Sequence, residues 1–216
     1  MKALRCTLIS DGPSDRALIP HLEWLLIQNG VKRPISIQWS ELRHLQKVPK
    51  ALSDKIEKTI ELYPCDLLFI HKDAERDDPL SKNEEVSTAI AKIKATIELP
   101  PFVCLVPVRM QEAWLLFDEA AIRRASGNPN GRIALPLPKL KTVEALSDPK
   151  DILHNLIRTA SGRSGRRLKQ LNIQHSATQV SRFIVDFSPL RTVVAFQRLE
   201  SALRETVKSL IDDISV

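Results

Sequence analysis

The segment Asp66-Leu67-Leu68-Phe69-Ile70-His71-Lys72-Asp73-Ala74-Glu75 indicates which kind of fold the chain adopts. Its apolar part, residues 67–70, is typical of a strand that is buried on both faces, as in a parallel sheet. Two carboxylates, Asp73 and Glu75, follow at once. In an open α/β sheet, ligands bind at the carboxyl ends of the strands. We therefore expect a ligand-binding edge where two acids share a hard divalent cation, with a solvated acidic loop as the alternative.

Other apolar segments have the length of strands, and segments with helical periodicity separate them. The expected strands cover residues 3–9, 35–39, 67–70 and 102–108, and the expected helices cover residues 16–29, 51–62, 85–97 and 110–125. Four strand–helix alternations are typical of a parallel sheet covered by helices on both faces. The sequence therefore predicts an α/β fold with a Rossmann-like, four-stranded, mainly parallel sheet and a helical C-terminal part.

The chain changes character after residue 126, where prolines divide it into short segments. We expect short helices at residues 141–146 and 149–160, and a final helix that begins at Ser188-Pro189. The final helix has an apolar stripe that either packs in the core or docks a partner: Phe196, Leu199, Leu203, Val207, Leu210 and Ile214. We predict an α/β core over residues 1–126 and a basic, mainly helical extension over residues 127–216, packed on that core.

The composition is that of an ordinary globular protein, with 216 residues of which 43% are hydrophobic and 27% charged. No apolar run approaches the ~20 residues of a membrane-spanning helix, and the N-terminus lacks the layout of a signal peptide. We therefore expect a cytoplasmic protein without a membrane partner. Cys6 and Cys104 fall within expected strands and are interpreted as small core residues.

The positive charge is concentrated in the second half of the chain. Through Asp118 there are 16 Lys and Arg against 17 Asp and Glu, whereas from Glu119 onward there are 16 against 9. Such an asymmetry suits an anionic partner, with nucleic acid as the leading candidate and ordinary surface charge as the alternative. The residues expected to follow a phosphate backbone are Arg158, Arg163, Arg166, Arg167 and Lys169.

Acidic residues follow three of the four expected strands. Asp11 follows the first, Asp73 and Glu75 the third, and Glu112 the fourth. In a parallel sheet all four carboxylates gather at one edge, where like charges raise one another's pKa. A Mg²⁺ or Mn²⁺ ion offsets that cost, so we predict a metal site formed by these four acids. For Glu112 the alternative is an acid favoured by the positive end of a helix dipole.

Three motifs resemble those of the Toprim fold. Asp11-Gly12-Pro13-Ser14-Asp15 looks like the Toprim motif Glu-Gly-x-x-Asp, and Asp73-Ala74-Glu75 looks like its Asp-x-Asp motif. The stretch Arg109-Met-Gln-Glu112-Ala-Trp114-Leu-Leu-Phe-Asp118 is similar to the Arg-x-x-Glu-Ala-Trp-Leu-x-x-Asp stretch of a bacterial Toprim-like family catalogued as domain of unknown function 4276. The segment Asp148-Pro149-Lys150 fits the same family. The resemblance covers most of the chain.

The resemblance implies a Mg²⁺-dependent nuclease, related to the Toprim domains of overcoming-lysogenization-defect nucleases. It also implies an ATPase partner, a setting in anti-phage defence, and an oligomer within a larger complex. Asp73 and Glu75 would hold the metal, and Asp11 would act as general acid/base or as a further ligand. Lys72 is expected in the catalytic site, and Arg109 is expected to contact the nucleic acid. Both would neutralise phosphate charge. The alternative for both is an ion pair with the neighbouring carboxylates.

Two departures from the Toprim pattern leave a second interpretation open. Asp11 stands where glutamate is usual, and Glu75 stands where the second aspartate is usual. Each change keeps the charge and alters the reach of the carboxylate by one methylene. The alternative is a catalytically degenerate Toprim-like subunit that binds and regulates an ATPase partner. A phosphohydrolase of small molecules or a nucleotide-binding protein is a third interpretation, against which the extended basic surface argues.

Overall fold

The computed structural model describes residues 2–74, 79–108 and 110–212. The chain forms two compact units, each assembled from separate segments. The first unit consists of Met1–Pro13, Leu25–Pro107 and Arg198–Val216, and the second consists of Ser14–Trp24 and Val108–Gln197. The predicted division at residue 126 is a different partition of the chain, and it stays a prediction.

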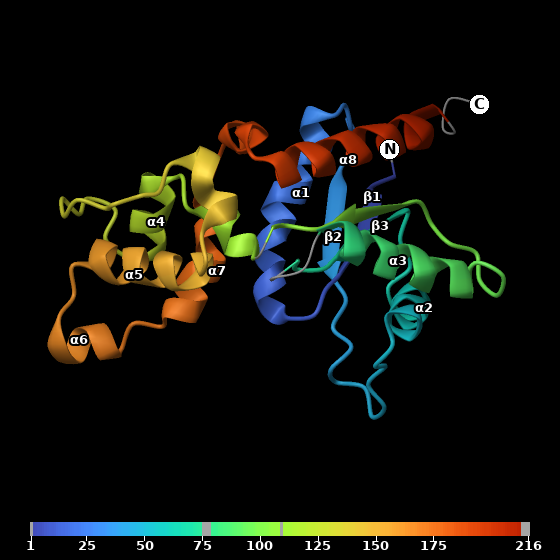
Figure 1. The fold of residues 1–216 in the computed structure, drawn as a ribbon, viewed down its shortest axis with the longest axis horizontal. Coiled ribbons are helices and arrows are strands. Elements are labelled where there is room, and N and C mark those ends of the chain that lie inside the picture. The colour runs from blue at the N-terminus through green and yellow to red at the C-terminus, as the bar shows by residue number, and fades with distance from the viewer. Residues whose placement is uncertain (1, 75–78, 109, 213–216) are drawn as a thin grey trace. The chain divides into compact units, whose positions relative to one another are not determined.

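The first unit is built on a four-stranded sheet in which all strands are parallel (Figure 1). The strands are β1 (Leu4–Ile9), β2 (Ile35–Trp39), β3 (Leu67–His71) and β4 (Phe102–Leu105), in the order β2-β1-β3-β4. Every residue of β3 is buried, as expected for a strand covered on both faces. The sheet confirms the predicted fold class.

One face of the sheet packs against α2 (Leu52–Leu62) and α3 (Pro79–Ile93). Ile9, Leu68 and Ile70 belong to the same buried cluster as Ile56 of α2 and Val86 of α3. Because side chains alternate along a strand, Leu8, Phe69 and Val103 lie on the opposite face, where they are also buried. Apolar side chains therefore pack on both faces of the sheet, and this packing fixes the positions of the strand ends.

The helices α1 (Ile19–Gln28) and α8 (Val194–Asp212) each contribute residues to both units. In the first unit, Arg204 of α8 donates a hydrogen bond from Nε to Oδ1 of Asn29 over 3.2 Å. Phe196, Leu199, Leu203 and Val207 are at most 3% exposed. The apolar stripe of this helix is therefore core packing at these four positions, and the alternative of a partner-docking surface is wrong there. Ile214 lies outside the described residues.

The second unit is made of helices and short 3₁₀ turns. Its α-helices are α4 (Glu119–Ala125), α5 (Pro149–Ser161), α6 (Gly165–Lys169) and α7 (Ile173–Phe183). Its 3₁₀ helices are η2 (Gln111–Leu115), η3 (Leu140–Ala145) and η4 (Ser188–Thr192). The 3₁₀ helix η1 (Pro13–Leu18) belongs to this unit from Ser14 onward. Among these, α6 extends away from the others, and α4, α5 and α7 pack together (Figure 1). The predicted helix at residues 149–160 is confirmed.

Several predicted boundaries were wrong, and each has a local cause. The helix expected over residues 110–125 is interrupted between η2 and α4, where Asp118 caps α4 by accepting a hydrogen bond from the N–H of Ala121. The strand β4 ends at Leu105 instead of residue 108, because Pro107 has no N–H for a ladder. The final α-helix begins at Val194, where Glu144 accepts hydrogen bonds from the N–H groups of Val194 and Ala195.

Two expectations from composition can be compared with the structure. Cys6, Cys65 and Cys104 are free thiols, and burial raises the pKa of Cys6 to about 12 and that of Cys104 to about 11. Cys6 is buried in β1, and Cys104 of β4 is partly buried against the core cluster, in line with their prediction as small core residues. Within residues 2–74, 79–108 and 110–212, no helix combines the length and the apolar character that crossing a membrane requires.

Candidate functional site

The carboxyl edge of the sheet brings Asp11 and Asp73 to the ends of neighbouring strands. Ile9 of β1 lies opposite Ile70 of β3 in the parallel register. Asp11 therefore follows Ile9 by two positions, and Asp73 follows Ile70 by three. The β3 end is extended by backbone hydrogen bonds from the N–H of Lys72 to Leu105 and from that of Ala74 to Pro107. Asp11 and Asp73 therefore lie at the ends of adjacent strands on one edge of the sheet.

Lysine side chains engage both carboxylate oxygens of Asp11. Lys55 of α2 donates from Nζ to Oδ1 over 2.8 Å, and Lys72 donates from Nζ to Oδ2 over 3.0 Å. Burial raises the pKa of Asp11, but the hydrogen bonds and charges of the two lysines together outweigh burial and bring the pKa below its usual value. Asp11 is therefore an anion at neutral pH, and two ammonium groups already compensate its charge.

Lys72 is held between two acids. Its Nζ lies 3.5 Å from Oε1 of Glu85 on α3 in addition to its contact with Asp11, and 17% of its side chain is exposed. Burial lowers the pKa of Lys72, whereas its hydrogen bonds and the charges of both acids raise it, and the net pKa lies above the ordinary value. The alternative of an ion pair with neighbouring carboxylates is therefore confirmed for Lys72, and its contact with phosphate stays a prediction.

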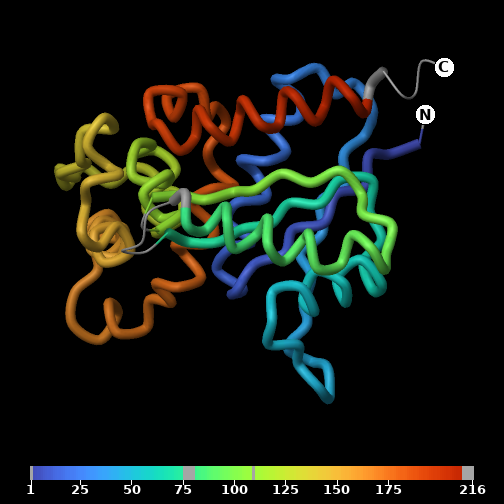
Figure 2. The backbone as a smooth tube through the Cα atoms, turned by 45° about the vertical axis from the view of Figure 1, so that its right-hand side comes forward, coloured from blue at the N-terminus to red at the C-terminus, as the bar shows by residue number. Residues whose placement is uncertain are grey.

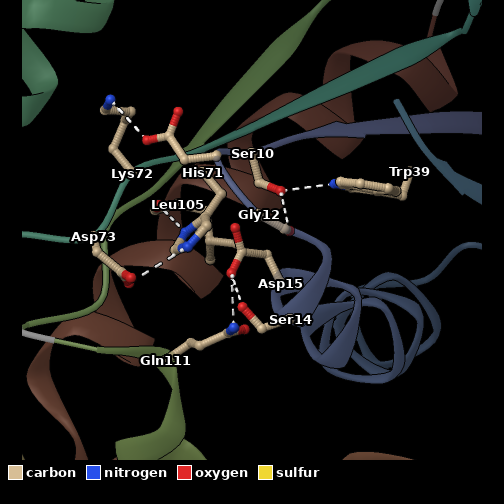
Figure 3. Close-up of polar contacts among 11 residues, drawn as sticks. Ser10, Gly12, Ser14, Asp15, Trp39, His71, Lys72, Asp73, Leu105 and Gln111 are labelled. Atoms are coloured by element: carbon tan, nitrogen blue, oxygen red, sulfur yellow. Dashed lines mark hydrogen bonds and ion pairs between the residues drawn. The ribbon is translucent and has the colours of Figure 1, made fainter. Parts of the chain in front are cut away.

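His71 lies beside the Asp73 carboxylate. Its Nδ1 lies 3.1 Å from the backbone oxygen of Leu105, and its Nε2 lies 3.4 Å from Oδ1 of Asp73 (Figure 3). A carbonyl oxygen only accepts hydrogen bonds, so Nδ1 carries a proton. The buried His71 and the Asp73 carboxylate are thus neighbours at the end of β3.

The structure describes only some of the residues that were predicted to bind the metal ion. Glu75 and Arg109 lie outside the described residues, and Glu112 belongs to the second unit, so Asp11 and Asp73 are the two predicted ligands that the described part of the first unit contains. In residues 2–74, 79–108 and 110–212, no group of three or more His, Cys, Asp or Glu side chains is arranged to hold a metal ion. A metal site that includes Glu75 stays a prediction.

Glu112 lies in a buried polar cluster of the second unit. With Gln111 and His154 it lines a cavity of about 20 Å³, which accommodates one water molecule. Gln111 donates from Nε2 to Oδ1 of Asp15 over 2.8 Å, and the hydroxyl of Ser14 donates to the same oxygen over 3.2 Å (Figure 3). Burial raises the pKa of Glu112 and outweighs the opposing effect of its backbone hydrogen bond. The pKa of Glu112 therefore lies above that of an exposed glutamate.

The predicted nucleic-acid-binding residues lie together in the second unit, from the last turns of α5 through α6. They are Arg158, Arg163, Arg166, Arg167 and Lys169. All but the half-buried Arg158 are exposed. The ion pairs that join described residues include none of the five. Gly162 ends α5 with a φ of 62°, a conformation that suits glycine and turns the chain toward α6. The binding of nucleic acid by these residues stays a prediction.

A second basic surface was missed in the sequence. The loop between β2 and α2, residues 40–51, projects from the first unit (Figure 2) and carries the exposed residues Arg43, Lys47 and Lys50. Together with the ends of β1 and β2, this loop surrounds a cavity of about 340 Å³. Three basic residues within one loop, directly after the carboxyl end of a strand, were a signal that could have identified it.

Comparison of the chain with models of protein families, with curated proteins and with solved structures gave no match. The Toprim-like assignment therefore depends on the three motifs.

Proposed function

We propose that the chain is a Mg²⁺- or Mn²⁺-dependent nuclease of Toprim type, which hydrolyses phosphodiesters as the effector subunit of an anti-phage defence system with an ATPase partner. The observation that carries the nuclease proposal is the placement of Asp11 and Asp73 at the ends of the adjacent parallel strands β1 and β3, beside Lys72. The defence setting and the ATPase partner follow from the resemblance of the motifs alone.

The donor set of the sheet edge fits a hard divalent cation in its chemistry. Asp73 offers carboxylate oxygens from a side chain that is 33% exposed, and the oxygens of Asp11 are bound to Lys55 and Lys72. We infer that Asp73 and Glu75 would bind the ion directly and that Asp11 would not be one of its direct ligands. When bound, the ion supplies polarisation of the phosphate and a bound water of lowered pKa.

The chain's own residues have distinct roles in this proposal. The lowered pKa of Asp11 keeps it anionic, which suits a weak general base or an orienting group and disfavours a general acid at neutral pH. The raised pKa of Lys72 keeps its ammonium charged, so that it can stabilise negative charge on phosphate oxygens. We infer that His71 is a positioning residue, because its Nε2 lies 3.4 Å from Oδ1 of Asp73.

The test is cleavage of plasmid DNA, single-stranded DNA and tRNA by the purified chain with Mg²⁺ or Mn²⁺. We expect Asp73→Asn and addition of a chelator to reduce the cleavage rate at least ~100-fold, a decrease typical of removing a group that stabilises charge in the transition state. Asp54→Asn, which removes an exposed acid from α2, is the matched control and should cleave like the unchanged chain.

The outcomes separate the nuclease from a contaminant or an inactive subunit. Cleavage that persists in Asp73→Asn would contradict the assignment of this site. Absence of cleavage by the unchanged, folded chain on all three substrates would contradict the nuclease. Calorimetric titration of Mg²⁺ or Mn²⁺ into the unchanged chain and into Asp73→Asn measures metal binding independently of cleavage.

One observation favours the second candidate, a degenerate Toprim-like subunit that binds and regulates an ATPase. Two lysines occupy both oxygens of Asp11, so this acid needs no metal ion to balance its charge. Such a subunit should bind its ATPase partner with the same affinity in Mg²⁺ and in chelator, and Asp73→Asn should leave that affinity unchanged. A metal-dependent affinity would contradict this candidate.

A further inference from the structure

The cavity beneath the β2–α2 loop lies at the edge of the sheet that binds ligands in open α/β folds. Its walls come from the ends of β1 and β2, from the loop and from α2. They are lined by Ile9, Ser10, Asp11, Trp39, Ser40, Glu41, Leu42, Arg43, Val48, Pro49, Lys50 and Lys55. All these residues belong to the first unit. A volume of about 340 Å³ falls within the range of sites for small molecules.

A buried hydroxyl in the wall lacks a partner. Ser40 is 3% exposed, and its Oγ forms no hydrogen bond with any residue that the structure describes. Its backbone N–H continues the sheet by donating to the oxygen of Leu8 over 2.9 Å, which fixes the position of the residue. Because this Oγ is inaccessible to solvent, it lies behind the surface of the cavity and offers no hydrogen bond to a ligand that fills it.

Of the three basic residues that line the cavity, one has no acidic partner among the described residues. Arg43 donates from Nε and Nη2 to the carboxylate of Glu41 over 2.9 and 2.7 Å, and Lys55 is paired with Asp11. Lys50 is exposed and takes part in no ion pair between described residues. Its ammonium is therefore available to an anionic group at the mouth of the cavity.

The remaining wall is apolar and aromatic. Leu42, Val48 and Pro49 come from the loop, and the indole of Trp39 is held by a 2.8 Å hydrogen bond from Nε1 to Oγ of Ser10 (Figure 3). The guanidinium of Arg43 lies 5.4 Å from the centre of the Trp39 ring. A ligand that fills this cavity therefore combines an anionic group with a flat or apolar body. A nucleotide has both properties, since its base stacks on apolar and aromatic surfaces and its phosphate pairs with lysine.

We propose that this cavity binds one nucleotide, with its phosphate at Lys50 and Lys55 and its base against Leu42, Val48 and Pro49. Asp11 lines the cavity and also belongs to the proposed catalytic site. The nucleotide is therefore the one adjoining the scissile phosphate of a nucleic-acid strand, and this placement rests on the proposed function. A free mononucleotide has the same chemistry and is distinguished by the test.

The test measures binding in chelator, where no cleavage takes place. A nucleoside 5′-monophosphate is titrated calorimetrically, and a labelled single-stranded oligonucleotide is followed by fluorescence anisotropy. We expect Lys50→Ala to weaken mononucleotide binding about tenfold, since a charge-assisted hydrogen bond is removed. Lys47→Ala is the matched control, because Lys47 is an exposed lysine of the same loop that does not line the cavity, and it should change the affinity less than about twofold.

Three results would overturn the proposal. These are no binding of the mononucleotide at millimolar concentration, equal losses of affinity for Lys47→Ala and Lys50→Ala, or competition by inorganic phosphate as strong as by the mononucleotide. If the oligonucleotide binds at least about tenfold tighter than the mononucleotide and Lys50→Ala weakens both, the site takes a nucleotide of a strand. If the mononucleotide binds more tightly than the oligonucleotide, the site takes a free mononucleotide and not a nucleotide of a strand. A chain that binds in chelator and never cleaves retains the cavity site and loses only the nuclease.

Discussion

His21 shows how a single buried side chain makes the second unit sensitive to pH. Its Nδ1 lies 3.1 Å from the backbone oxygen of Ala17, and its ring centroid lies 4.2 Å from that of Phe187 and 5.9 Å from that of Trp114. Burial lowers the pKa of this imidazole to about 4, and hydrogen bonds to backbone groups of Ala17 and Trp114 oppose that effect only in part. The folded unit therefore contains neutral His21 at all pH values above that range.

We predict that the second unit becomes less stable as the pH falls from 6.5 toward 4. In that window the unfolded chain binds a proton at this histidine that the folded chain does not bind, so the free energy of unfolding decreases as the pH falls. With a folded pKa of about 4, the decrease between about pH 7 and pH 5 is about 2 kcal/mol. Urea unfolding followed by tryptophan fluorescence measures it in a Trp39→Phe background, where Trp24 and Trp114 of the second unit report.

Replacement of the histidine separates this contribution from other titrating groups. His21→Leu should remove about 2 kcal/mol of the difference between about pH 7 and pH 5. The exposed His175 of the same unit provides the control, and His175→Leu should keep the pH dependence of the unchanged chain. An unaltered pH dependence in His21→Leu would show that another group is responsible.

Individual site residues were predictable where local sequence decides their position. Asp11 and Asp73 follow apolar strand segments, and parallel pairing then brings them to one edge. Their partners depend on tertiary packing instead. Lys55 reaches Asp11 from 44 positions away, and Glu85 reaches Lys72 from α3, and no local pattern indicates either interaction. The sequence analysis therefore identified both acids and missed Lys55, which pairs with Asp11.

The caps of the helices in the second unit explain two parts of the motifs that resemble the Toprim-like family. Asp118 accepts a hydrogen bond from the N–H of Ala121 at the start of α4, and Asp148 accepts one from the N–H of Asp151 at the start of α5. Pro149 occupies the first turn of α5, where its missing N–H costs least. These two acids have a structural role that is sufficient to account for their presence.

We predict that Asp148→Ala destabilises the second unit by about 1 kcal/mol, because the first turn of α5 is deprived of its side-chain cap. Asp148→Asn keeps an oxygen that accepts the same hydrogen bond and should retain most of the stability. Urea unfolding in the Trp39→Phe background measures both variants. Equal destabilisation by alanine and asparagine would show that the charge of Asp148, and not its capping hydrogen bond, matters.

Strands were easier to predict than helices in this chain, for a physical reason. The strand β3 is a compact apolar run that is buried on both faces, and β2 at the sheet edge alternates apolar and polar residues. Both patterns are visible in the sequence, and all four strands were found. The helices of the second unit are short and depend on caps and on packing against one another. The segments that form α6 and α7 were not predicted as helices, although Asn172 caps α7 through the N–H of His175.

The distribution of charge over the molecule leads to a prediction about nucleic-acid binding. We expect the triple variant Arg163→Ala, Arg166→Ala and Arg167→Ala to bind single-stranded DNA more weakly. The slope of log K against log salt should become less steep by roughly 0.7 for each phosphate group that the variant no longer neutralises. Anisotropy titrations at several salt concentrations in chelator measure this slope.

A variant of equal charge serves as the control for this prediction. Lys139→Ala, Lys141→Ala and Arg182→Ala together remove three exposed cations from the same unit. If both triple variants change the slope equally, binding follows net charge, and the surface of α5 and α6 has no special role. If only the first variant changes it, the phosphate backbone is bound there.

Neither compact unit is continuous along the chain, because the first is made of three segments and the second of two. A stop codon or a fusion junction placed anywhere from residue 25 to residue 197 therefore divides the first unit, and one placed between residues 24 and 108 divides the second as well. Separate expression of either unit requires grafting segments through new linkers or permuting the termini. Exchange of one unit between related genes would therefore need more than one crossover at matched positions.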